Sequence, residues 1–184
     1  KYVKEKTVWN YLNRRRIPAL IFGVPQTYPP KPLNGILVAS FLTPSKDVQY
    51  TWPDEIKAEL DKAADGDYII DVKDFRTENK DWLLEQIYLM TERRFKAFRH
   101  FYKKDEFPFA IMVEMGIDRI HHGFWRFFDR GHRLYEPGNK YENAIHDYYV
   151  YVDEQIGRLL NELDDKTSVM VVSCLLYTSP SPRD

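Results

Sequence analysis

The sequence predicts an α/β protein with a mostly parallel central sheet. Short apolar runs that are typical of buried strands alternate along the chain with longer stretches whose apolar residues recur at helical spacing. Parallel strands are joined through helices, so an alternation of strand, helix and strand favours a parallel sheet with helices packed on it.

Four apolar runs are short enough to be strands, at residues 17–24, 36–41, 107–113 and 167–173. The last is β-branched and apolar on both faces, which is typical of a buried parallel strand. Between the first two runs lies Pro25-Gln-Thr-Tyr-Pro-Pro-Lys-Pro32, followed by the turn signal Asn34-Gly35. We therefore expect a rigid, structured loop there and not a flexible linker.

Two long stretches have the apolar period of amphipathic helices, at residues 79–102 and 141–163. A shorter helix is predicted within residues 46–67, after Trp52-Pro53, because proline is tolerated near a helix start. Residues 9–13 end a further helical stretch, and the Arg14 to Arg16 run that follows is interpreted as a solvated helix end.

Composition excludes several classes of function. A chain of 184 residues with 43% hydrophobic content can form one domain or a large piece of one. Its 27 Lys and Arg against 28 Asp and Glu give no basic field, so no nucleic-acid polymer is expected as a partner. No apolar run approaches the roughly 20 residues that span a bilayer, so no membrane span is expected.

The chain begins at Lys1 without a methionine or a signal core, so a targeting signal cannot be read. The single cysteine, Cys174, excludes an internal disulfide and suits a reducing compartment, which makes the cytoplasm the default location.

The last residues do not continue the pattern of the fold. Residues 174–184, Cys-Leu-Leu-Tyr-Thr-Ser-Pro-Ser-Pro-Arg-Asp, have no periodicity and match, codon for residue, one reading frame of a common transposase sequencing adapter. We therefore expect residues 1–173 to be a fragment of one domain and residues 174–184 to be translated adapter that is not part of the fold.

Asp118 and His122 are the candidate metal ligands. In an open α/β sheet ligands bind beyond the carboxyl ends of the strands, which directs attention to the segments after Val24, Val113 and Ser173. A carboxylate and an imidazole four residues apart share one face of a helix, and both are ligands that zinc or manganese accepts. A metal ion would also offset the cost of burying the carboxylate in this apolar segment.

The alternative interpretation of Asp118 is a surface ion pair with Arg119 or Arg126. His121 points elsewhere on the helix and is expected to be packed or solvent-facing, and no ligand-like spacing distinguishes the other two downstream histidines, His132 and His146. The aromatic residues beside the pair are expected to form core around the site, with an aromatic wall for substrate as the alternative; they are Phe124, Trp125, Phe127 and Phe128.

Several of these segments together resemble the type I phosphodiesterase/nucleotide pyrophosphatase group of the alkaline phosphatase superfamily. The segments are Pro25-Gln-Thr-Tyr-Pro-Pro with Asn34-Gly35, Phe41-Leu-Thr-Pro44, Met115-Gly-Ile-Asp-Arg-Ile-His-His-Gly-Phe-Trp125 and Tyr135-Glu-Pro-Gly138. The resemblance covers nearly all of residues 1–173. It implies an alkaline phosphatase-like three-layer sandwich, incomplete at both ends.

The resemblance also implies a metal centre and a reaction. It assigns Asp118 and His122 to one of two divalent metal ions, zinc with manganese as the alternative. The second ion would take ligands from an Asp-His-Gly sequence that follows the family's strand at 167–173, where this chain has Cys174. The Thr or Ser nucleophile lies in an N-terminal segment outside this chain, so we assign no catalytic residue within it and expect the fragment alone to be inactive.

The implied function of the parent protein is metal-dependent hydrolysis of phosphoester or phosphodiester bonds, including nucleotide pyrophosphates, in a phosphorylated small molecule. One alternative is a phosphomutase that uses the same two metal ions and returns the phosphoryl group to the substrate. Another is a non-catalytic binding module, in which the proline-rich loop and the aromatic segment form a partner surface and no metal is needed. The sequence defines neither the substrate nor the oligomeric state.

Overall fold

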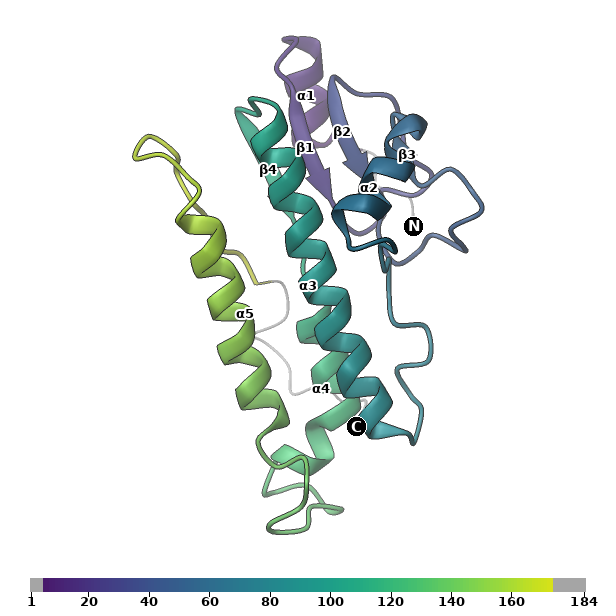
Figure 1. The fold of residues 1–184 in the computed structure, drawn as a ribbon, viewed down its shortest axis with the longest axis vertical. Helices are drawn as coiled ribbons and strands as arrows, with labels where there is room; N and C mark the ends of the chain where they lie inside the picture. The colour runs from purple at the N-terminus through teal and green to yellow at the C-terminus, as the bar shows by residue number, and fades with distance from the viewer. Residues whose placement is uncertain (1–4, 174–184) are drawn as a thin grey trace.

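The computed structural model describes residues 5–173 as an α/β fold. A four-stranded sheet occupies one end of the molecule, and long helices extend beyond it (Figure 1). The elements in chain order are α1 (Val8–Arg14), β1 (Ala19–Phe22), β2 (Gly35–Val38), β3 (Thr51–Trp52), a 3-10 turn (Asp54–Ile56), α2 (Lys57–Ala63), α3 (Lys80–Lys104), β4 (Phe109–Met112), α4 (Gly116–Phe128) and α5 (Ala144–Leu160).

The sheet is mostly parallel, as predicted, and its strand order is β3-β2-β1-β4. Strand β1 pairs in parallel with both neighbours, with Ala19 opposite Gly35 on β2 and Phe109 on β4. The short β3 adds to the outer edge of β2 in the antiparallel direction. Because β1, β2 and β4 run in the same direction, the segments that follow them emerge at the same end of the sheet, beyond the carboxyl ends of the strands.

The first of two hydrophobic cores surrounds β1, whose four residues are all buried. Phe22, at the end of the strand, makes edge-to-face ring contacts with Tyr68 and Phe98. Helices α1 and α3 both pack against β1. A strand buried on both faces is typical of a parallel sheet that is flanked by helices.

The second core lies among α3, α4 and α5, which all contact one another. Helix α3 passes along the sheet and continues beyond it, so that its first half packs against α4 and α5 (Figure 1). Because α3 contacts both the sheet and α4, the three-helix core fixes α4 relative to the sheet.

Among residues 5–173, no helix is both long enough and apolar enough to cross a membrane.

Most of the predicted elements are confirmed within a few residues at each end. The runs at 17–24, 36–41 and 107–113 contain β1, β2 and β4, and the stretches at 79–102 and 141–163 correspond to α3 and α5. The shorter helix is α2, and the Arg14 to Arg16 run is exposed at the end of α1. Strand β3 was not predicted, because two residues are too few to show a period.

The prediction of a buried strand at 167–173 is wrong for this structure. These residues form no helix or strand, and the side chains of Met170 and Val171 are 85% and 81% exposed. A β-branched apolar run has only a preference for strand, and it becomes buried when a neighbouring strand and a covering layer accept it. Within residues 5–173 the run pairs with no strand, and β4 forms the edge of the sheet. The predicted adapter segment, 174–184, lies outside the described residues.

Residues 167–173 are exposed and β1 is buried, which predicts different responses to substitution at one apolar position in each. Val171→Asp should change the free energy of unfolding by no more than about 0.5 kcal/mol, because a solvated side chain loses no packing. Ile21→Ala, in the fully buried β1, should lower it by about 2–5 kcal/mol. Urea denaturation followed by circular dichroism measures both. A loss above about 2 kcal/mol for Val171→Asp would mean that the segment is buried in solution.

Candidate metal centre

Helix α4 begins directly beyond the carboxyl end of β4, and polar contacts fix its first turn. The Val113 amide donates to the Phe22 carbonyl, which extends the pairing of β4 with β1. The Glu114 carboxylate then accepts from the Gly116 amide at 2.6 Å and from the Thr91 hydroxyl at 3.1 Å. A carboxylate at a helix N-terminus is favourable because it satisfies a free amide and complements the helix dipole.

Gly116 allows α4 to pack closely against α5. A Cβ atom at this position would lie 1.8 Å from the hydroxyl oxygen of the buried Tyr148, which is itself 2.6 Å from the Thr91 hydroxyl. Burial, with the nearby Glu114 carboxylate, raises the pKa of Tyr148 well above its ordinary value. Tyr148 therefore stays a neutral phenol that bridges α5 and α3.

The buried Arg94 of α3 joins the two chain segments that flank the candidate site. Its guanidinium donates to the Val113 carbonyl at 3.0 Å and to the Ile70 carbonyl at 2.8 Å. Ile70 precedes Asp71, and Val113 lies three residues before α4. Hydrogen bonds from a charged, buried donor therefore set the position of residues 70–71 relative to the start of α4.

Asp118 and His122 lie on one face of α4, as predicted. Asp118 Oδ1 and His122 Nε2 are 3.5 Å apart, and the two side chains are 30% and 29% exposed. Two ligands that each bind a tetrahedral zinc ion at about 2.0–2.1 Å are themselves about 3.3 Å apart. The separation of these two atoms therefore fits two ligands of one metal ion, and their exposure leaves it access.

The second carboxylate oxygen of Asp118 is held by Arg119. Arg119 Nη1 donates to Asp118 Oδ2 at 2.6 Å, and the same guanidinium binds Asp71 in a bidentate pair through Nε and Nη2 at 2.8 and 2.7 Å. The Asp118–Arg119 ion pair that was the alternative interpretation thus exists, but the Arg119 side chain is only 7% exposed. Arg126 instead pairs with Glu78 at 3.1 Å.

Aromatic rings enclose this ion-pair cluster. The Arg119 guanidinium carbon lies 4.3 Å from the centre of the Phe75 ring and 5.9 Å from that of Phe41, the latter in the segment after β2. Phe75 also contacts the imidazole of His122, with ring centroids 5.7 Å apart. The rings shield the guanidinium from water, which strengthens its interactions with both carboxylates.

The charge balance of the cluster suits a cation. Burial alone would lower the pKa of Arg119, but hydrogen bonding to Asp71 and the charges of Asp71 and Asp118 leave that pKa above its ordinary value. The guanidinium therefore stays protonated and neutralises one of the two carboxylates that contact it. One negative charge remains beside the His122 imidazole.

The two candidate ligands would not complete a metal site by themselves. Among residues 5–173, no group of three or more His, Cys, Asp or Glu side chains lies close enough to hold a metal ion. Asp118 Oδ1 and His122 Nε2 can provide two ligands, and a structural zinc ion takes four. A metal ion bound there would take its other ligands from water, substrate or side chains that are not near this pair.

The family model described as type I phosphodiesterase / nucleotide pyrophosphatase matches residues 1–173. The chain belongs to this family. The comparison confirms the resemblance that the sequence motifs indicated, and the α/β fold is consistent with an alkaline phosphatase-like fold. Comparisons with curated proteins and with solved structures gave no match.

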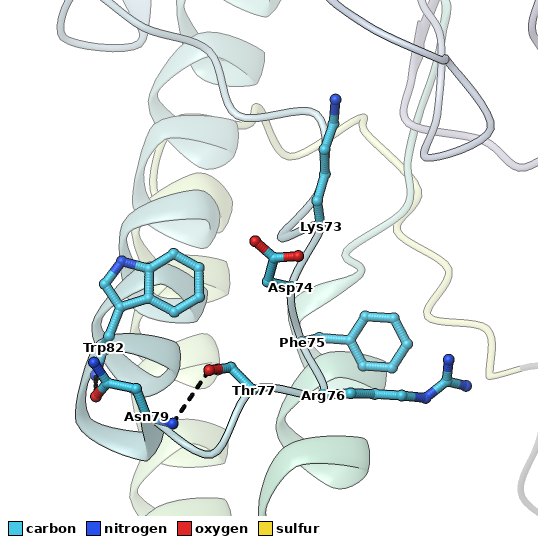
Figure 2. A pocket seen from close by; sticks show the side chains of 7 residues that line it. All are labelled: Lys73, Asp74, Phe75, Arg76, Thr77, Asn79 and Trp82. Atoms are coloured by element: carbon cyan, nitrogen blue, oxygen red, sulfur yellow. Dashed lines mark hydrogen bonds between the residues drawn. The ribbon is translucent and has the colours of Figure 1, made fainter.

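A shallow hollow of about 660 Å³ lies next to the candidate site of this phosphodiesterase-family chain. It is lined by residues 73–77, Asn79 and Trp82. Figure 2 shows Phe75 and Arg76 projecting to the opposite side of the 73–77 loop from Trp82. Phe75 lines the hollow and also contacts Arg119 and His122, whereas Asp118 is not among the residues that line it.

The other predicted residues have mixed outcomes. His121 is packed, with its Nε2 3.2 Å from the Tyr149 hydroxyl and its ring against Trp125, whereas His146 is exposed. Phe124 is buried as expected of core, but Phe128 is exposed. Of the three segments expected to form the site, that after Val113 contains both candidate ligands, and that after Ser173 lies outside the described residues.

Two residues of the cluster were missed or undervalued by sequence reasoning. The sequence does not predict Asp71 as a site residue, and it predicts Arg119 only as a partner in a surface ion pair. The available signal was an acidic residue within the apolar run Tyr68-Ile-Ile-Asp-Val72, since a carboxylate in a buried segment needs a partner. That partner is 48 residues away in sequence, which no local pattern identifies.

The close packing around Gly116 in α4 and the open space around Gly157 in α5 predict opposite effects of an alanine substitution. Gly116→Ala should lower the free energy of unfolding by about 1–3 kcal/mol, because the new methyl group overlaps the Tyr148 hydroxyl. Gly157→Ala in α5, with no atom within 4 Å of the new Cβ, should raise it by about 0.5–1 kcal/mol through helix propensity. Urea titrations of both variants give the comparison, and equal effects would contradict the close approach of α4 to Tyr148.

Proposed function

We propose that residues 1–173 belong to a longer gene product that hydrolyses phosphodiester or phosphoester bonds in a phosphorylated small molecule with the help of divalent metal ions. Family membership supports the reaction class. The observation that carries the metal dependence is the 3.5 Å separation of Asp118 Oδ1 and His122 Nε2 on one face of α4. Both side chains are partly exposed, and α4 follows the carboxyl end of β4, where ligands bind in α/β folds.

Asp118 and His122 would hold one ion, zinc in the first instance and manganese as the alternative. A second ion, with ligands outside the described residues, follows from the family resemblance. Bound at such a site, divalent ions neutralise charge on the phosphoryl oxygens and lower the pKa of the attacking hydroxyl.

The residues of this chain orient and shield the ligands. The Asp118 carboxylate is fixed at one oxygen by Arg119, which leaves the other facing His122. Phe75 covers one side of the imidazole and keeps water away from the Arg119 pair. These contacts would hold both ligand atoms in place before a metal ion arrives, which reduces the entropy lost on binding.

The first step of the test is to sequence the source gene across the junction after Ser173. We expect Asp-His-Gly in place of Cys174, and the gene product then provides the protein for kinetic measurements. A junction that retains Cys174-Leu-Leu would remove the second metal's ligands and favour the binding module.

In that gene product, Asp118→Ala and His122→Ala should each lower kcat/KM for bis(p-nitrophenyl) phosphate by at least about 100-fold. The loss of about 2.7 kcal/mol of transition-state stabilisation expected from a lost metal ligand corresponds to that factor. EDTA should abolish the wild-type activity, and zinc or manganese should restore it. The 184-residue chain itself should show no turnover, because the family resemblance places the nucleophile outside it.

His146→Ala is the matched control, since this exposed histidine contacts only Asp147 in the hydrogen bonds and ion pairs of the described residues. Its kcat/KM should stay within twofold of wild type. Unchanged activity and metal content in both ligand variants would contradict the proposal and favour a non-catalytic binding module.

A further inference from the structure

We propose that the buried Asp71–Arg119 pair is a positioning device that orients the Asp118 carboxylate for metal binding through Oδ1 alone. The inference rests on the proposed function, because it assigns a role to residues that contact a proposed ligand. It goes further in naming two residues that do not themselves bind the metal and the geometry that they impose.

The guanidinium of Arg119 is fixed by three directed hydrogen bonds. Nε and Nη2 donate to the two oxygens of Asp71, which gives the planar fork one orientation, and this leaves Nη1 aimed at Asp118 Oδ2. A bidentate arginine–carboxylate pair sets orientation as well as energy. Lysine has a single rotating ammonium group and cannot reproduce this arrangement.

Packing removes the remaining freedom of the guanidinium. The Phe75 and Phe41 rings lie against it, and the Asp71 and Arg119 side chains are 14% and 7% exposed. Arg94 fixes the chain beside Asp71 by its hydrogen bond to the Ile70 carbonyl. Asp118 thus meets a donor whose position is set by the core.

The two oxygens of Asp118 therefore have different partners: Oδ2 accepts from Arg119, and Oδ1 faces His122. Without Arg119, a carboxylate that is 30% exposed on a helix could rotate and present either oxygen or both. With Oδ2 held, Oδ1 stays 3.5 Å from His122 Nε2, the separation that suits one shared ion. Polar groups that hold a metal ligand in this way raise metal affinity by about 10–100-fold.

The test measures metal binding at His122 in the 184-residue chain, with Mn²⁺ as the probe. In histidine-labelled protein, bound Mn²⁺ broadens the NMR signals of nearby imidazoles. His122 is the reporter and the adjacent His121 should broaden with it, whereas His100, His132 and His146, which lie outside α4, are the internal references. Wild type should show saturable broadening at His122. Asp71→Asn and Arg119→Lys should each weaken the apparent Mn²⁺ affinity at His122 by about 10-fold or more.

Asp71→Asn keeps the shape of the side chain and leaves Arg119 in place, so it remains informative if Arg119→Lys does not fold. A coupled measurement separates positioning from general support of the fold: Asp71→Asn should have no further effect on Mn²⁺ affinity in an Arg119→Met background, because it acts only through the guanidinium. Arg126→Lys, on the same helix but paired with Glu78, is the matched control and should leave the affinity unchanged.

The two proposals fail in different ways. Absence of Mn²⁺ broadening at His122 in wild type would overturn the proposed metal site and the positioning role together. Broadening in wild type that Asp71→Asn and Arg119→Lys leave within twofold would overturn the positioning role alone. An effect of Asp71→Asn that persists in full in the Arg119→Met background would also overturn it.

Discussion

The fold depends on the central position of β1. This strand is buried on both faces and pairs in parallel with β2 and β4. The segments that follow all three strands therefore emerge at the same end of the sheet, beyond the carboxyl ends of the strands. Phe41 after β2 and helix α4 after β4 meet at this end of the sheet, around Arg119. Arg94 completes the arrangement by hydrogen bonding to the carbonyls of Ile70 and Val113, which links the segment of Asp71 to the start of α4. A different strand order would separate the residues of the candidate site.

The candidate site is built around a buried cation. Taking the Arg119 guanidinium and the carboxylate of Asp71 out of water is costly, and the attraction between them repays that cost only with good hydrogen-bond geometry. Here the geometry is bidentate, yet an apolar pair of similar volume could give equal stability. The benefit of the pair is specificity: it fixes one oxygen of Asp118 and leaves a negative charge beside His122. Under the proposed function, that benefit is the orientation of a ligand for a metal ion.

The sequence predicted the features of this fold that local patterns encode. Apolar runs and helical periods identified β1, β2, β4, α3 and α5, and the Asp118–His122 spacing placed both side chains on one helical face. Features that depend on distant partners were not predictable in this way. The run at 167–173 has the composition of a strand but no pairing neighbour among the described residues. Asp71 joins the site only through Arg119, and a surface ion pair and a buried one have the same sequence signature.

The binding of one metal ion by Asp118 and His122 is tested most directly by anomalous diffraction at the zinc edge. Crystals of the chain soaked in zinc should show an anomalous peak within about 2.0–2.2 Å of both Asp118 Oδ1 and His122 Nε2. Asp118 Oδ2 should remain bonded to Arg119 in the same crystals. Zinc peaks at His132 or His146, with none between Asp118 and His122, would contradict the claim.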